Sequence, residues 1–205
     1  MSYNMMARLF LLFIISIVGI SGCSDEPSVY NRFSMGKNVI CYGDDITAGY
    51  GVELSEAYPY LLGQKTGEPV INAGKVGITT QEALARLKEE VLDKNPRLVI
   101  LELGTNDYTK NINKEETFEN IDQIVLRVQN AGAMVAIVTT RVGIIQDTYL
   151  DGYREIAKKR RAVLIPNIMQ DIADNLELSF ETIHPNTKGQ RIIAERIYQA
   201  IKHII

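Results

Sequence analysis

Five short, continuous apolar runs divide the chain. Each is rich in branched apolar residues, and each is followed by polar or small residues; the runs cover residues 38–42, 69–72, 97–103, 134–140 and 162–166. Runs of this length and composition are typical of strands that are covered on both faces. The pattern therefore predicts five buried strands.

Helical patterns separate these runs. Residues 80–92 repeat apolar side chains at helical spacing. Asn113 and Glu116 have the spacing of a capping box at the start of a helix that runs to about residue 131, and a last helix is expected over 187–204. Strands interleaved with helices predict an α/β fold, a three-layer α/β/α sandwich around a five-stranded parallel sheet.

The N-terminus follows a different pattern. Arg8 precedes a short, largely apolar stretch that ends in small residues before Cys23, as an export signal does. The ending "GISGC" resembles a bacterial lipoprotein signal, which implies removal of residues 1–22 and a lipid on Cys23. Ser24 follows, and in enteric-type bacteria the resemblance favours the outer membrane, facing the periplasm. An N-terminal anchor helix with a fortuitous cysteine is the alternative.

The rest of the chain divides simply. Residues 23–37 are polar and unpatterned and are predicted to be a tether, and residues 38–205 form one domain. The 205 residues are 46% hydrophobic, which suffices for one core. If Cys23 carries a lipid, Cys41 is the remaining thiol and no intramolecular disulfide can form.

Charge and motifs exclude several function classes. The net charge is −3, the two signs are interspersed, and no basic stretch offers a footprint for phosphates, so nucleic acid is not expected as a partner. No metal cluster, phosphate loop or cofactor motif stands out, and we expect neither a metal nor a cofactor. A ligand of the predicted sheet should bind beyond the carboxyl ends of its strands.

Polar residues with chemical potential gather where this argument places the ligand. Gly43-Asp44-Asp45 follows the first strand, residues 72–80 follow the second, residues 104–108 follow the third, and residues 181–189 precede the last helix. Taken singly, these segments could be turns chosen for backbone geometry. Four such segments at corresponding places in one α/β chain indicate a shared site.

The four segments resemble the sequence blocks of the SGNH or GDSL hydrolases. That family contains esterases, lipases, thioesterases and carbohydrate deacetylases with a flavodoxin-like fold. The resemblance implies an oxyanion hole built from Gly77 and Asn106, with His184 as the general base. Glu181 stands where the family has the aspartate that orients this base, and Asp45 stands where the family has its serine nucleophile.

Other residues near these blocks have simpler interpretations. Asp44 is predicted to be a turn former that bonds nearby backbone N–H groups. Thr47 is a conceivable substitute hydroxyl, but two residues further along it should point elsewhere. His203 is expected to be solvated at a helix end, whereas His184 lies in a Pro-Asn loop three residues after an acid.

Asp45 changes the chemistry that the resemblance implies. A carboxylate has no proton to give to His184, so the ordinary acyl-serine mechanism cannot operate. Its charge also opposes the negative charge that develops in an oxyanion hole. An aspartate can nevertheless act as a nucleophile, or it can activate a water molecule with His184 as the acid.

Three hypotheses follow for the function. The first is a hydrolase of ester bonds in small acylated substrates, such as an esterase, lysophospholipase or arylesterase, with a changed mechanism. The second is a catalytically weak or inactive, lipid-anchored domain of the cell envelope that binds an acylated or glycan ligand. The third is a structural envelope protein without a ligand.

Overall fold

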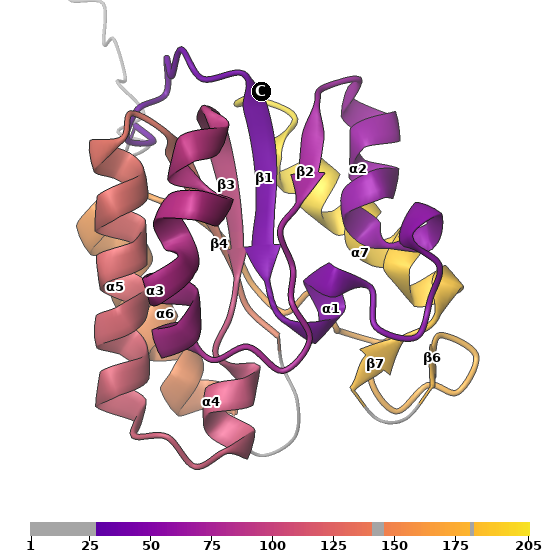
Figure 1. Ribbon diagram of the computed structural model, residues 1–205. Helices are drawn as coiled ribbons and strands as arrows, with labels where there is room; N and C mark the ends of the chain where they lie inside the picture. The colour runs from indigo at the N-terminus through magenta and orange to yellow at the C-terminus, as the bar shows by residue number, and fades with distance from the viewer. Residues whose placement is uncertain (1–27, 141–145, 181–182) are drawn as a thin grey trace, which may run out of the picture.

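The computed structural model describes residues 28–140, 146–180 and 183–205 (Figure 1). Its central sheet is parallel throughout and has the strand order β2-β1-β3-β4-β5, the flavodoxin-like order. The strands are β1 (Asn38–Gly43), β2 (Val70–Asn72), β3 (Pro96–Glu102), β4 (Met134–Val138) and β5 (Val163–Ile165). The predicted five-stranded parallel sheet is confirmed, and every strand end lies within two residues of its predicted position.

The helices and short elements complete the fold. The longer helices are α2 (Tyr58–Thr66), α3 (Thr80–Glu90), α5 (Lys114–Asn130), α6 (Gln146–Arg160) and α7 (Thr187–Ile201). The short elements are α1 (Asp45–Ala48), η1 (Leu54–Glu56), η2 (Leu92–Lys94), α4 (Thr105–Thr109) and the antiparallel pair β6 (Ser179–Phe180) and β7 (His184–Pro185). The three predicted helices are α3, α5 and α7, whereas α2 and α6 were not predicted.

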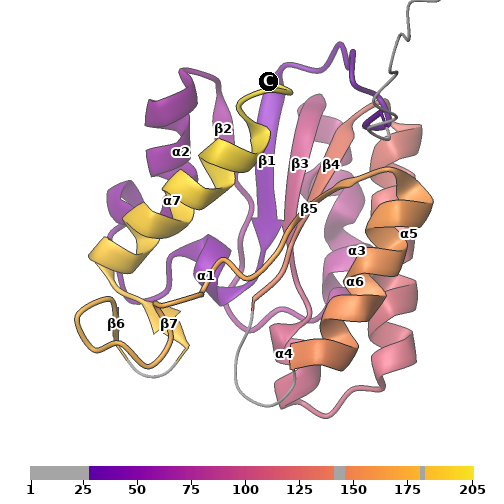
Figure 2. The same ribbon diagram turned by 180° about the vertical axis from the view of Figure 1, so that it is seen from behind.

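The helices form two layers, one on each face of the sheet (Figures 1 and 2). Helices α2 and α7 pack on one face, and α3, α5 and α6 pack on the other. Alternate residues of one strand serve the two cores: Leu98 and Ile100 of β3 point to the first layer, and Val99 and Leu101 point to the second. The expected three-layer sandwich is therefore present.

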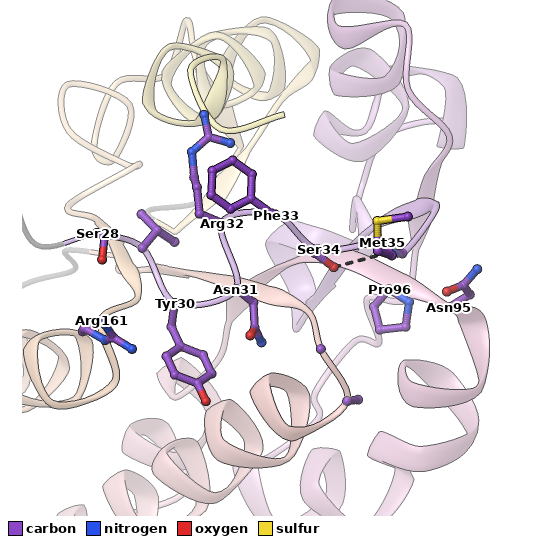
Figure 3. A pocket seen from close by; sticks show the side chains of 14 residues that line it. Ser28, Tyr30, Asn31, Arg32, Phe33, Ser34, Met35, Asn95, Pro96 and Arg161 are labelled. Atoms are coloured by element: carbon purple, nitrogen blue, oxygen red, sulfur yellow. Dashed lines mark hydrogen bonds between the residues drawn. The ribbon is translucent and has the colours of Figure 1, made fainter.

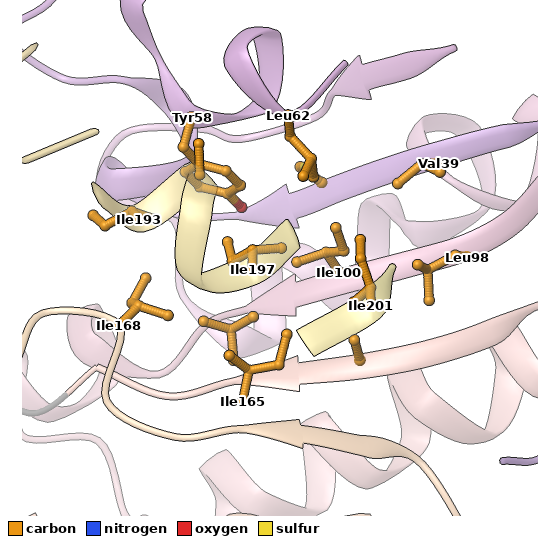
Figure 4. Packing of buried hydrophobic residues seen from close by; sticks show 14 of the residues in the cluster. Val39, Tyr58, Leu62, Leu98, Ile100, Ile165, Ile168, Ile193, Ile197 and Ile201 are labelled. Carbon is orange, nitrogen blue, oxygen red and sulfur yellow. The ribbon is translucent and has the colours of Figure 1, made fainter. Parts of the chain in front are cut away.

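The first layer shows why α7 stays on the sheet (Figure 4). Ile193, Ile197 and Ile201 recur at helical spacing along α7 and are completely buried against the strands and α2. Full burial of a large aliphatic side chain contributes about 1.5–3 kcal/mol. This stripe holds the last helix, and through it the preceding β7, against the sheet.

Helix starts differ in detail from the prediction. Asn113 caps α5, but its side chain accepts from the backbone N–H of Glu115, and the capping box predicted with Glu116 is not seen there. A complete capping box instead starts α3, where Thr79 and Glu82 bond each other's backbone. That cap fixes the loop between β2 and α3.

The N-terminal part of the described chain is attached to the domain. The Asn31 side chain donates to the carbonyls of Gln129 and Ala133 at 2.8 and 3.0 Å, and Arg32 donates to the carbonyl of Ile204 at 3.0 Å. Residues 28–37 were expected to be tether, and these bonds place them on the fold instead. The predicted signal peptide and Cys23 lie outside the described residues. No helix in the described part of the chain is long and apolar enough to cross a membrane.

Candidate active site

Asp45 begins the site at the carboxyl end of β1, where it is the first residue of α1. The turn before it is crowded: a Cβ at Gly43 would stand 2.2 Å from Thr47 Oγ1 and 2.5 Å from the carbonyl oxygen of Glu102. Only glycine fits that space. The chain therefore turns sharply out of the sheet and presents the Asp45 side chain, which is 19% exposed, beyond the strand end.

One carboxylate oxygen of Asp45 receives two hydrogen bonds. Its Oδ2 accepts from the backbone N–H of Gly77 at 3.1 Å and from Nδ2 of Asn106 at 2.7 Å. The two donors come from the loop after β2 and from α4 after β3. Bonds to an ionised acceptor are stronger than bonds between neutral groups. The two predicted oxyanion-hole residues are thus brought together, and the Asp45 carboxylate lies between them.

The loop around Gly77 is fixed by its backbone and by one lysine. Gly77 has a φ of +75°, a conformation that residues with a Cβ rarely adopt. Its carbonyl accepts from Nζ of Lys110 at 2.8 Å. The N–H of Gly77 is therefore aimed at Asp45 by local geometry.

Asn106 is held through its neighbour in sequence. Asp107 is completely buried, and it accepts from the backbone N–H of Thr80 at 2.9 Å and also from the Thr80 hydroxyl. These bonds join α4 to the start of α3. Because these bonds hold α4 against α3, they help to keep the Asn106 amide beside Asp45.

His184 approaches Asp45 from the other side. Its Nε2 lies 4.0 Å from Oδ1 of Asp45, the carboxylate oxygen that does not bond Gly77 and Asn106. The imidazole contacts two aromatic rings that also contact each other: its centroid lies 4.8 Å from that of Tyr50 and 5.6 Å from that of Phe180, and those two lie 6.0 Å apart. Glu181, the predicted orienting acid, lies outside the described residues. His203, the alternative histidine, lies two residues beyond the C-terminal end of α7.

The convergence of these side chains encloses a small cavity. Its volume is about 140 Å³. A cavity of this size accommodates one benzene-sized group. It is lined by Asp44, Asp45, Ile46, Thr105, Asn106, Thr109, Ile183 and His184.

Asp44 differs in part from its predicted role. Its side chain is buried against the carboxyl group of Glu102. Burial, then the Glu102 charge, raises the pKa of Asp44 well above its ordinary value. Burial likewise raises the pKa of Glu102 to about 7, although hydrogen bonds from Thr47 and Asp44 oppose the shift. A hydrogen bond from the backbone of Ile46 agrees with the predicted turn former, and the burial of Asp44 against a second acid is the part that was not predicted.

Thr47 points away from the cavity, as predicted. Its hydroxyl is completely buried and lies 2.9 Å from Oε2 of Glu102 and 3.0 Å from the Tyr58 hydroxyl. It fixes α1 to β3 and α2. The threonine therefore has a structural part in the site and offers no substitute nucleophile.

Three contributors were missed from the sequence: Glu102, Lys110 and Phe180. Glu102 lies in the apolar run that predicts a strand. The one sign of its role in the sequence is that it is a single acid in an otherwise largely apolar run. Such an acid needs a partner inside the fold. Lys110 and Phe180 gave no comparable signal, because each acts through a contact between distant segments.

As an arrangement, the site is built to hold one negative charge. Two fixed donors face the place where the oxygen of a tetrahedral intermediate would sit, and an imidazole lies across the cavity. The Asp45 carboxylate occupies those donors in the structure. Such a constellation suits acyl transfer.

Comparison with known proteins agrees with this geometry. The chain is 28% identical over 182 residues to Thioesterase 1/protease 1/lysophospholipase L1 of Escherichia coli K12, covering 85% of this chain and 88% of that one. It is 27% identical over 180 residues to an arylesterase of Vibrio mimicus, covering 82% and 90%. The crystal structure of the psychrotrophic esterase EstA from Pseudoalteromonas sp. superposes with a TM-score of 0.75 at 28% identity, covering 82% and 97%.

A family model matches the part of the chain that contains most of the site. It describes the GDSL-like Lipase/Acylhydrolase family and matches residues 41–192. The match runs from β1 into α7 and includes every residue that lines the cavity. On this match, and with the fold and the relatives above, the chain belongs to the GDSL-like lipases and acylhydrolases, a family of ester hydrolases.

Proposed function

We propose that the protein hydrolyses ester or thioester bonds of small acylated substrates, and that Asp45, which stands in the family's serine position, keeps this activity low. The observation that carries the proposal is the position of the Asp45 carboxylate between Gly77 and Asn106 with His184 opposite. The two donors, the imidazole of His184 and the cavity suit the hydrolysis of acyl esters. The carboxylate at position 45 does not, because it is a poorer nucleophile than a serine hydroxyl activated by histidine.

A route without serine is available to these groups. Oδ1 of Asp45 and Nε2 of His184 are 4.0 Å apart, a separation at which one water molecule can contact both. The water oxygen attacks the acyl carbon and gives its proton to Asp45. The bond to the leaving oxygen, or to the leaving sulfur of a thioester, then breaks, and that atom takes a proton from a protonated His184. A proton passed from Asp45 to His184 restores the starting state, and the products are an acid and an alcohol or thiol.

Asp45 limits this route in two ways. Its Oδ2 holds the donors that would otherwise stabilise the developing oxyanion, and its charge repels that oxyanion. Loss of one oxyanion-hole donor costs about 10²–10³ in kcat in a serine protease. We therefore expect slow turnover. The same occupied donors also favour the second candidate, a catalytically weak domain that binds an acylated ligand.

Asp45→Ser tests the proposal on short-chain aryl esters. The substitution frees both donors and supplies a hydroxyl beside His184, so we expect activity to rise by at least about tenfold, a small part of the 10⁶-fold or larger accelerations that enzymes reach. The gain should disappear when His184→Ala is added. A fast wild-type enzyme that loses activity in Asp45→Ser would establish Asp45 as an effective catalyst. A folded Asp45→Ser variant without activity would favour the binding domain.

We also propose that a lipid on Cys23 holds the domain at the bacterial envelope, on the periplasmic face of the outer membrane. The support is the sequence from Ile20 to Ser24, which has the form of a lipoprotein signal. Metabolic labelling with a fatty-acid analogue should tag the full chain, and Cys23→Ser should remove the tag. A tag that survives this substitution would contradict the proposal.

A further inference from the structure

The end of the domain opposite the active-site cavity, here called the cleft, carries a surface that the proposed chemistry does not use. Residues 28–36, here called the N-terminal segment, border an open hollow of about 780 Å³ together with the loops that precede β3 and β4 (Figure 3). These loops lie at the amino ends of the strands. Helices α1 and α4 and strand β7, which carry the cleft, lie at the other end of the molecule (Figures 1 and 2).

Two large apolar side chains of the N-terminal segment project into solvent. Phe33 is 91% exposed and Met35 is 92% exposed, more than any other large apolar residue in the described part of the chain. Single exposed apolar side chains are ordinary. These two stand two positions apart on one short segment, so they form a common apolar feature.

The fold holds these side chains out. Within the segment, the Tyr30 N–H donates to the carbonyl of Arg161 at 2.9 Å, and the side chains of Asn31 and Arg32 each donate to two further carbonyls of the domain. The backbone next to Phe33 is therefore anchored to the domain. The Phe33 side chain is exposed because the fold holds it there, and not because the segment lacks contacts with the domain.

The charge around the hollow is positive. Within the described residues, Arg32 donates to two neutral carbonyls and to no acid, and the Arg161 guanidinium lies 4.9 Å from the centroid of the Tyr30 ring (Figure 3). Among the residues of 28–140 and 146–161 that border the hollow there is no aspartate or glutamate. Exposed apolar side chains next to cations that pair with no described acid suit a surface that rests on anionic lipid.

The chain supplies that lipid surface close by, if Cys23 is lipidated as proposed above. Ser28 follows Cys23 by five positions. However they are arranged, five residues span at most about 18 Å. The bilayer that holds the lipid must then lie within this distance of the N-terminal segment.

We propose that the N-terminal segment rests on the bilayer that holds Cys23, with Phe33 and Met35 in the lipid interface and the cleft directed away from it. Strand β1, with six residues, separates the two ends by about 20 Å. A cleft at that height does not reach the phospholipids of the anchoring bilayer. The substrate is therefore an acyl ester or thioester that arrives through the aqueous compartment.

Tryptophan fluorescence tests this orientation, because the chain contains no tryptophan. The full lipidated chain is reconstituted as Phe33→Trp, with Tyr108→Trp in α4 as the matched reporter at the cleft end. The vesicles contain phosphatidylethanolamine and phosphatidylglycerol, with and without phosphatidylcholine brominated on its acyl chains. We expect blue-shifted emission and strong quenching by the brominated lipid for Phe33→Trp, and neither effect for Tyr108→Trp.

Each other outcome has a definite meaning. Lipidated protein with no quenching in Phe33→Trp, or with equal quenching in both variants, overturns the orientation and leaves the hydrolase proposal standing. A blue shift that depends on protein concentration, without quenching by the brominated lipid, would show that a second copy of the chain covers this face. That result would also overturn the orientation. A chain without the fatty-acid tag overturns both the anchor and the orientation. Aryl-ester turnover of Asp45→Ser, measured separately, decides the hydrolase proposal.

Discussion

Oδ2 of Asp45 lies 2.7 Å from Nδ2 of Asn106, and the same oxygen receives the N–H of Gly77. On the function proposed above, the protein thus binds its own side chain at the donors that would face a reacting acyl oxygen. In chemical terms, the Asp45 carboxylate is a built-in ligand of an anion pocket. This relationship determines how the pocket should respond to substitution.

Removal of this side chain should open the pocket to small carboxylates. We expect Asp45→Ala to bind acetate with a Kd in about the millimolar range, because two donors remain but little apolar surface is buried. Chemical shifts of the Gly77 and Asn106 amides, followed by NMR during an acetate titration, measure this binding.

Asp45→Asn is the matched control for that titration. Its amide oxygen can replace Oδ2 between the same donors without the charge, so we expect no acetate binding in Asp45→Asn or in the wild type. Equal binding in all three proteins would mean that acetate sits elsewhere. The prediction would then fail.

The buried acid pair should make stability fall as pH rises. The pKa of Glu102 is raised from 4.5 to about 7, so between these values the folded protein keeps a proton that the unfolded chain has lost. The folded state then binds more protons, and the free energy of unfolding decreases with pH across this window. At about 1.4 kcal/mol per pKa unit, the loss from this group is on the order of 3 kcal/mol.

Glu102→Gln should flatten this dependence. The amide still accepts from the Thr47 hydroxyl, and like a protonated acid it carries no charge, at any of these pH values. Urea unfolding at about pH 5 and about pH 8 compares the two proteins. An unchanged pH slope in Glu102→Gln would show that other groups cause it.

A methyl group at Gly104 should destabilise the loop between β3 and α4, which carries Asn106. Gly104 has a φ of +115°, and a Cβ there would stand 2.3 Å from the Tyr153 hydroxyl, which donates to the carbonyl of Leu103 at 2.6 Å. We expect Gly104→Ala to lower the free energy of unfolding by about 2–4 kcal/mol, from backbone strain and the displaced tyrosine.

Gly67→Ala separates the two causes. Gly67 has a φ of +70°, and no atom lies within 4 Å of the place that an added methyl group would take, so its variant should show backbone strain alone, about 1 kcal/mol. Urea unfolding of both variants gives the difference. Equal losses would remove the contact with Tyr153 as an explanation.

The sheet could be predicted because every strand is a continuous apolar run. Strands such as β4, in which all five residues are buried, carry this signal without ambiguity. Helix α6 lacks an equivalent signal: it contains Gly152 and ends in Lys158, Lys159 and Arg160. Gly152 is accommodated by close contact with Phe118, where a Cβ would stand 2.4 Å from the ring. A contact of that kind depends on tertiary packing.

The sequence predicted that Asp45, Gly77, Asn106 and His184 would lie close together, but not the hydrogen bonds between them. Gly77, Asn106 and His184 could be selected because each follows or precedes a predicted element in a family-like order. The sequence does not reveal which oxygen of Asp45 meets which donor, since that depends on side-chain torsions at the end of β1. The partnership of Asp44 with Glu102 was missed for a related reason, because the two acids lie at the ends of neighbouring strands 58 positions apart.

Arg32 joins the beginning of the described chain to its end, through the carbonyls of His203 and Ile204. Asn31 beside it holds the chain between α5 and β4 through Gln129 and Ala133. A force applied to the chain ahead of Ser28 would therefore act on residues that are hydrogen-bonded to the domain. Arg32 would transmit part of this force to the residues after the last helix, and Asn31 would transmit the rest to the start of the central strand β4, so the domain would resist extraction as a single body.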